Sequence, residues 1–203
     1  MQRLIILFLL FSSGSIVRGQ EISHSAEVAE ALVNDFFGDT GKVYTYNAQI
    51  AFGSNPMSGT LLIKKTQNGH RLAITTPFGN TLLDCSLNET EFHVHYVVKD
   101  LDRKLVLKTL REDFRLMLTK QFANKEVNER ENGYLVTGTF DTRRTECWFE
   151  KEPLLLKSIL FKKKKKIKTE LTFEAKKTNF AKHILIKHFN LPLTIELSEI
   201  SDD

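Results

Sequence analysis

Two histidines, His93 and His95, come nearest to metal chemistry in this sequence. They lie in the alternating segment Glu91 to Val98, where residues two apart point to the same side of a β-strand, so both imidazoles could reach one ion. A zinc site needs more than two protein ligands, and no neighbouring cysteine or second histidine pair supplies them by spacing. We therefore interpret both as surface histidines and expect no metal and no other cofactor.

Patterns that would indicate an enzyme are missing from the sequence. The segment from Gly38 to Lys42 resembles a phosphate-binding loop, but its glycines are too close together and no serine or threonine follows the lysine. There is no Gly-x-Ser-x-Gly elbow, and the acidic residues are scattered. We predict that the chain is not an enzyme.

Two cysteines, Cys85 and Cys147, allow a single disulfide pairing if the chain is exported to a compartment that permits disulfides. The alternative is two separate buried thiols that pack as small apolar groups. The sequence alone leaves both alternatives open.

Six lysines within seven positions form the sharpest local charge feature. They are Lys162, Lys163, Lys164, Lys165, Lys166 and Lys168, between two predicted strands. Successive like charges repel one another and favour a solvated turn, so one interpretation is an exposed hairpin tip that resists aggregation. The other is contact with an anionic membrane surface, which attracts each lysine by about 1 kcal/mol.

The first residues predict export. Residues 1–19 combine Arg3, an apolar run from Leu4 to Phe11 and a small residue, Gly19, as a cleaved signal peptide does. The run is too short to span a bilayer. We expect residues 20–203 to form one exported, soluble domain. Without Arg3 and Arg18 the formal charge falls from +4 to +2, which does not indicate a nucleic-acid partner.

The elements that would position these residues are mostly strands. The segment Gly59 to Cys85 contains two turn signals, Gln67 to Gly69 and Thr76 to Gly79, which divide it into three antiparallel strands. Val43 to Phe52 alternates with period two, as Glu91 to Val98 does. Further strands are expected at Tyr134 to Phe140, Glu146 to Phe149, Leu154 to Phe161, Ile167 to Ala175, His183 to Phe189 and Leu191 to Leu197.

Two helices are predicted. The first runs from Ser25 to Phe37, and the second opens at Thr109, where Glu112 completes a capping box. Roughly ten short strands with two amphipathic helices predict a mainly β fold of the α+β type. A single sheet of this size must curl, since twisted open sheets rarely exceed about ten strands. The helices would then cover its concave apolar face.

Several segments resemble the periplasmic lipoprotein carriers and receptors of the LolA/LolB type. The resemblance rests on the export signal, the N-terminal helix, Ser58 to Ile63, and Leu72 to Gly79 with its Pro-Phe-Gly turn, followed by Thr81 to Leu83. It implies an incomplete antiparallel barrel whose hydrophobic cavity accepts lipoprotein acyl chains. The receptor branch carries a lipidated cysteine at its mature start, and this sequence has none there.

Candidate cavity residues come from the inward sets of the strands and the second helix. They are Tyr46, Ile50, Phe92, Val94, Tyr96, Phe114, Met117, Leu118, Leu171 and Phe173. The alternative is that they fill an ordinary core, because hydrophobic periodicity reports burial and not empty space.

The sequence thus predicts an exported carrier of lipoprotein acyl chains or another lipid, for transfer towards the outer membrane. Its expected partners are that lipid, an anionic membrane surface and other envelope transport proteins. A non-enzymatic envelope scaffold or partner-binding module with a filled core is the alternative. A hydrolase acting on an acyl substrate comes third.

Overall fold

A computed structural model describes residues 28–177 and 179–200 of the chain. The chain divides into two units, residues 1–32 and residues 33–203. In the first unit, residues 28–31 are helical. The predicted signal peptide lies outside the described residues. No helix among the described residues is long and apolar enough to cross a membrane.

The second unit is built on one antiparallel sheet of twelve strands, in the order β5-β4-β3-β2-β1-β12-β11-β10-β9-β8-β7-β6. The strands are β1 Val43–Phe52, β2 Asn55–Thr66, β3 Gly69–Thr75, β4 Thr81–Leu87, β5 Phe92–Val97, β6 Ala123–Arg130, β7 Gly133–Phe140, β8 Arg143–Glu150, β9 Leu155–Lys163, β10 Lys166–Lys177, β11 Phe180–His188 and β12 Leu193–Glu199. The sheet is open, because β5 and β6 each have a partner on one side only. The mainly β prediction is confirmed; strong curvature into an incomplete barrel stays a prediction.

The predicted turns and alternation are present. Gly69 and Gly79 both have positive φ: Gly69 is the first residue of β3, directly after its turn, and Gly79 lies in the turn before β4. Along β1, alternate residues from Tyr44 to Ile50 are buried. One strand was not predicted: β6 reads ANKEVNER, and Val127 alone in it is a strong strand former. As an edge strand exposed over most of its length, β6 needs little apolar pattern.

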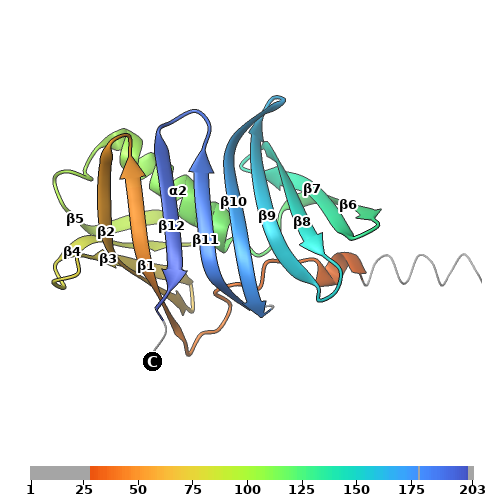
Figure 1. Cartoon of the computed structure of the whole chain (residues 1–203), viewed down its shortest axis with the longest axis horizontal. Coiled ribbons are helices and arrows are strands. Elements are labelled where there is room, and N and C mark those ends of the chain that lie inside the picture. Colours follow the sequence, from red (N-terminus) through yellow and green to blue (C-terminus); the bar gives the residue numbers. More distant parts are fainter. Residues whose placement is uncertain (1–27, 178, 201–203) are drawn as a thin grey trace, which may run out of the picture. The chain divides into compact units, whose positions relative to one another are not determined.

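The helix of this unit, α2, runs from Lys104 to Leu118 and lies behind the sheet in the view of Figure 1. The predicted start at Thr109 is wrong. Thr109 lies inside the helix, where its hydroxyl donates to the carbonyl oxygen of Leu105 one turn earlier instead of capping a first turn. The apolar stripe that the sequence predicts from Leu110 to Phe122 is confirmed for Leu110, Phe114, Met117 and Leu118, which are buried, but Phe122 lies beyond the end of the helix.

The first predicted helix ends early. Residues 32–35 are not helical, and Phe37 has a φ of 64°. The cause is Asn34, whose side-chain amide donates to the carbonyl oxygens of Met117 and Thr119 and whose Oδ1 accepts from the N–H of Phe36. These bonds tie the segment to the end of α2 and offer the backbone an alternative to a helix.

Aromatic rings then fill the buried face of the sheet beside this segment. The ring of Phe36 lies 5.1 Å from that of Phe173 in β10, and Phe37 lies 5.1 Å from Tyr44 in β1. Phe180 in β11 stacks near Tyr44 and Tyr46. This end of the core is packed side chain against side chain.

The disulfide alternative is wrong: Cys85 and Cys147 are free, buried thiols. Cys85 lies in β4 and Cys147 lies in β8. Seven strands separate β4 from β8 in the sheet order. Each thiol therefore packs as a small apolar group within its own part of the sheet.

Candidate functional site

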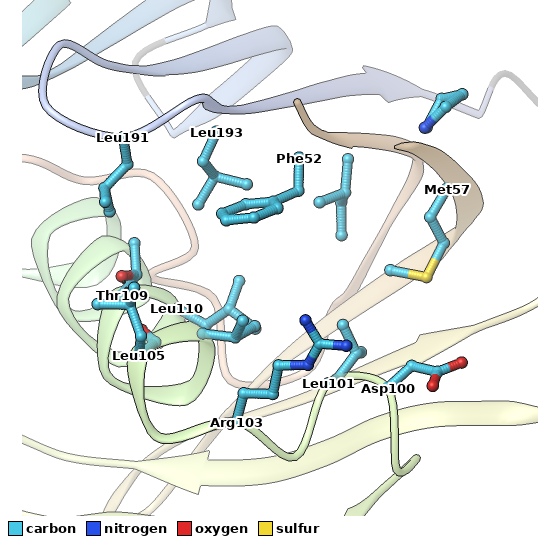
Figure 2. A pocket seen from close by; sticks show the side chains of 13 residues that line it. Phe52, Met57, Asp100, Leu101, Arg103, Leu105, Thr109, Leu110, Leu191 and Leu193 are labelled. Atoms are coloured by element: carbon cyan, nitrogen blue, oxygen red, sulfur yellow. Dashed lines mark hydrogen bonds between the residues drawn. The ribbon is translucent and has the colours of Figure 1, made fainter. Parts of the chain in front are cut away.

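An apolar cavity of about 450 Å³ lies between the sheet and the first half of α2. Its walls come from β1, β2, β12, the loop before α2 and the first two turns of that helix (Figure 2). Ten of its thirteen lining residues are apolar: Ile50, Phe52, Pro56, Met57, Leu101, Leu105, Val106, Leu110, Leu191 and Leu193. Its volume is within the range of ligand pockets, roughly 300–1,000 Å³.

The cavity reaches solvent at a rim that mixes apolar and charged groups. Phe52 is 40% exposed and Leu105 is 54% exposed, although both line the cavity. The remaining lining residues, Asp100, Arg103 and Thr109, are the polar ones. The hydroxyl of Thr109 is used within α2. Asp100 and Arg103 are exposed, so the charged groups sit at the mouth and the interior stays apolar.

The predicted cavity residues are placed in three different environments. Ile50 lines the cavity. Leu118 lies at the opposite end of α2, where it lines a wider, polar depression of about 980 Å³. The other buried ones belong to the packed core: Tyr46, Phe114, Met117, Leu171 and Phe173. Tyr46 also donates its hydroxyl to the carbonyl oxygen of Ala181, and burial raises its pKa.

The predicted residues of β5 are less buried than expected. Phe92 and Val94 are half-buried, and Tyr96 is 51% exposed. The reason is position, since β5 is an edge strand.

The sequence did not identify most of the cavity wall. Phe52, Leu101, Arg103 and Leu105 line the cavity but are not among the predicted site residues. They become neighbours because α2 begins at Lys104, well before the predicted start. Leu105 and Val106 lie in its first turn, and a longer helix would have predicted them as its inward face.

A buried polar pair joins α2 to β11 behind this cavity wall. Asp113 and His188 are 2% and 8% exposed, and His188 Nε2 lies 3.0 Å from Asp113 Oδ1. His188 Nδ1 lies 3.2 Å from the carbonyl oxygen of Leu193, a cavity residue. A signal for this pair exists in the sequence: Asp113 interrupts the apolar stripe of α2, and His188 alternates with Ile184 and Ile186.

Burial and the contact between the two side chains together set the pKa values of this pair. Burial raises the pKa of Asp113, and the bond to His188 offsets part of that effect. Burial alone lowers the pKa of His188, but the hydrogen bond and charge of Asp113 outweigh it, and the net pKa of His188 is raised. Both shifts favour holding a proton between the two groups.

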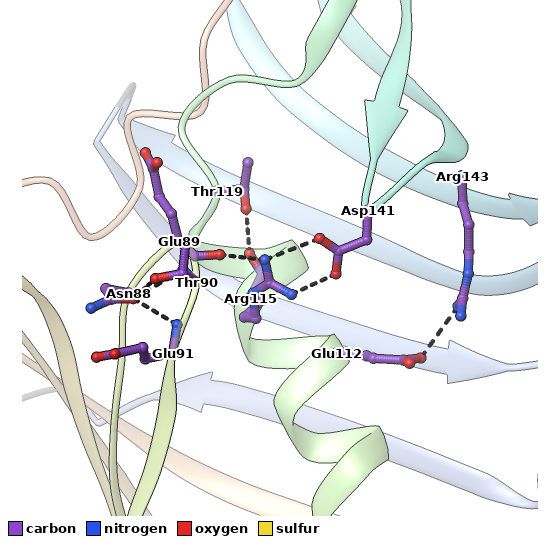
Figure 3. A network of polar contacts seen from close by, with 9 residues as sticks. All are labelled: Asn88, Glu89, Thr90, Glu91, Glu112, Arg115, Thr119, Asp141 and Arg143. Atoms are coloured by element: carbon purple, nitrogen blue, oxygen red, sulfur yellow. Dashed lines mark hydrogen bonds and ion pairs between the residues drawn. The ribbon is translucent and has the colours of Figure 1, made fainter.

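The last turn of α2 is fixed by a second polar cluster (Figure 3). The guanidinium of Arg115 donates two bonds to the carboxylate of Asp141, in the turn between β7 and β8. It also donates to the carbonyl oxygen of Glu89, between β4 and β5. One side chain therefore connects α2 to loops from both halves of the sheet.

The lysine run lies where the β9–β10 hairpin turns. Lys163 to Lys166 are exposed, with Lys164 at a φ of 59° in the turn. Lys162 is different, because its ammonium group pairs with Glu146. Lys168 is half-buried. The hairpin-tip interpretation is confirmed for the four exposed lysines; membrane contact stays a prediction.

The rings of His93 and His95 lie 4.6 Å apart, and His95 bonds the hydroxyl of Ser86. No three histidine, cysteine or acidic side chains of residues 28–177 and 179–200 gather as a metal site would require.

Comparison with known proteins adds a fold relationship. No family model and no curated protein sequence matches the chain. A crystal structure from Vibrio parahaemolyticus, provisionally described as an outer membrane lipoprotein-sorting protein domain, matches with 11% identity, a TM-score of 0.51 and 91% of each chain covered. A DUF1329 family protein from Desulfovibrio piger matches with 10% identity, a TM-score of 0.49 and 90% of each chain covered. The chain therefore shares the fold of the LolA-like lipoprotein-sorting domain that its sequence resembles.

Proposed function

We propose that this protein is a carrier that holds the acyl chain of a lipid or lipoprotein in the cavity between β1, β2, β12 and α2. The observation that supports this most directly is an apolar cavity with an open mouth, because a filled core would need neither. Each methylene that leaves water gains about 0.8 kcal/mol. A chain of ten methylenes would gain about 8 kcal/mol before the cost of ordering it.

The cellular role follows from the predicted signal peptide and from the fold. We infer an exported, non-enzymatic protein of the periplasm that passes its cargo towards the outer membrane through other envelope transport proteins. The lipoprotein-sorting description of the Vibrio domain supports this role by its shared fold. A sheet curved enough to form an incomplete barrel would wrap its apolar face around α2 and the cargo.

The exposed lysines of the β9–β10 hairpin give the carrier a means of reaching its membrane. Lys163 to Lys166 place four positive charges at one solvated turn. Attraction to anionic lipid at about 1 kcal/mol per lysine would hold the protein transiently, and salt would weaken it.

A substitution that fills the cavity tests the proposed carrier function most directly. Val106 lines the cavity from α2, whereas its neighbour Leu107 is also half-buried but is not a lining residue. Val106→Trp places an indole into the cavity, and Leu107→Trp places the same group outside it. Binding of a fluorescent dodecanoyl probe to both variants and the wild type is measured by titration, with circular dichroism melts to confirm folding.

The carrier predicts that Val106→Trp lowers probe affinity at least tenfold while Leu107→Trp keeps it within about threefold. Native mass spectrometry of the protein from its own envelope should also show a stoichiometric acylated ligand. A folded wild type that takes up neither the probe nor added lipopeptide would favour the scaffold alternative.

A further inference from the structure

Arg103 is the unusual residue of the cavity mouth. It lies between Leu101, which is buried, and the first residue of α2, Lys104. Figure 2 shows its guanidinium directed into the space between the helix and the strands. Among the described residues, no carboxylate, carbonyl or hydroxyl accepts a bond from this guanidinium. Arg103 is exposed, so water hydrates its donors, and an anion at the mouth would replace that water with charge-assisted hydrogen bonds.

The charges around Arg103 favour an anion at this point. Asp100 also lines the mouth, but its carboxylate points away from the cavity in Figure 2. Asp102 is exposed and does not line the cavity. On the other side, the first turn of α2 has no acidic residue and Arg103 makes no side-chain cap. The partial positive charge of that helix end therefore adds to the guanidinium.

We propose that Arg103 binds the anionic head group of a single-chain amphiphile whose acyl chain occupies the cavity. This rests on the proposed acyl-binding function and adds a ligand class to it. The apolar lining accepts the chain whatever its head, so it cannot select among lipids. Arg103, the one cation among the lining residues, can, because an anionic head group forms charge-assisted, bidentate hydrogen bonds that are stronger than the bond a neutral hydroxyl accepts.

The planar guanidinium suits both carboxylate and phosphate oxygens, since its fork of donors matches either anion. A fatty acid and a phosphate-bearing single-chain lipid therefore share the required chemistry. Comparing the two heads on one chain length distinguishes these sources.

The test compares three ligands that differ only in the head: laurate, dodecyl phosphate and dodecanol. Each displaces a fluorescent acyl probe at pH 8, below its micelle concentration and at low salt. The proteins are the full chain, Arg103→Gln, Arg103→Lys and Lys108→Gln. Lys108 is an exposed residue of the same helix that does not line the cavity, so Lys108→Gln removes an equal charge away from the mouth.

We expect the wild type to bind at least one anionic ligand about tenfold more tightly than dodecanol, equal to about 1.4 kcal/mol. Arg103→Gln should abolish this preference without weakening dodecanol, Arg103→Lys should keep part of it, and Lys108→Gln should keep it whole. The anion with the larger preference identifies the head-group class.

Two kinds of result would overturn the proposal. One refutes head-group recognition alone, and the other also refutes the proposed carrier function. If dodecanol binds as tightly as the anions, or if Arg103→Gln leaves the preference unchanged, head-group recognition fails while acyl binding stands. If the folded wild type binds none of the three ligands, the proposed carrier function fails as well.

Discussion

The buried pair of Asp113 and His188 should be one of the most sensitive points of the fold. His188 Nδ1 faces the carbonyl oxygen of Leu193, which can only accept, so Nδ1 carries a hydrogen. The 3.0 Å contact between His188 Nε2 and Asp113 Oδ1 then needs one further proton, on either atom. Asp113 Oδ2 is buried with no partner, so it offsets none of the cost of desolvation.

Asp113→Ala removes the partner of a histidine that has almost no access to water. Breaking a buried pair from one side costs about 3–5 kcal/mol, because the remaining group is buried and unpaired. Asp113→Asn is the matched control: its amide nitrogen can donate to unprotonated Nε2, so we expect a loss of about 1 kcal/mol. Urea unfolding followed by circular dichroism measures both values.

The pH dependence should separate the two variants further. The raised pKa of His188 means that the folded chain keeps the shared proton at pH values where the unfolded chain, with a histidine pKa of about 6.5, has released it. The contribution of this proton to the free energy of unfolding is therefore complete below about pH 6.5, and above that pH it falls by up to about 1.4 kcal/mol per pH unit. Asp113→Asn lacks the proton in the folded state, so the cost of this substitution should be larger at pH 6 than at pH 8.5.

Two observations would contradict this account. An Asp113→Ala variant within about 1 kcal/mol of the wild type would mean that the pair is no more than a replaceable contact. An equal cost of Asp113→Asn at pH 6 and pH 8.5 would mean that no proton is held between the two side chains.

Three further predictions concern sites away from this pair. Arg115→Ala should lower the free energy of unfolding by about 1–2 kcal/mol, since it leaves Asp141 and a loop carbonyl without their donor; chemical denaturation measures it. Burial raises the pKa of both Cys85 and Cys147 to about 12, so iodoacetamide at pH 8 should alkylate neither thiol in the native protein and both after unfolding, as counted by mass spectrometry. Replacing Lys163–Lys166 with glutamate should abolish binding to vesicles rich in anionic lipid at low salt and leave the melting temperature within a few degrees; unchanged vesicle binding would refute the membrane contact.

The sequence predicted the sheet well because strand signals are local. Period-two alternation and the turn glycines depend on neighbouring residues, and they located β1 to β5 closely. The same alternation could not separate cavity from core. Tyr46 and Ile50 lie on one face of β1, four residues apart, yet Tyr46 packs in an aromatic cluster and Ile50 lines an open space. Tyr46 and Ile50 differ in the segments that pack opposite them, and the sequence of β1 alone does not determine those segments.

Errors arose where distant contacts override local preference. Asn34 stops a helix that its apolar spacing would continue, because its amide binds carbonyl groups beyond residue 116. Arg103 carries no local signal at all. It matters only because the loop before α2 meets the ends of β1, β2 and β12, which lie far from it in sequence.

The polar contacts of α2 explain why the cavity lies at one end of this helix. In its second half, Asp113 bonds β11, Arg115 bonds two loops, and the carbonyl of Met117 accepts from Asn34. Among the described residues, Lys104 to Lys108 make no side-chain hydrogen bond or ion pair with the sheet, and Leu105 and Val106 line the cavity between this half of α2 and the sheet. Apolar contacts have no fixed geometry, so we expect the first half of α2 to adjust more easily than the second half, which the polar contacts hold in register. The proposed carrier would need this combination of a fixed end and an adaptable end to accept and release its cargo.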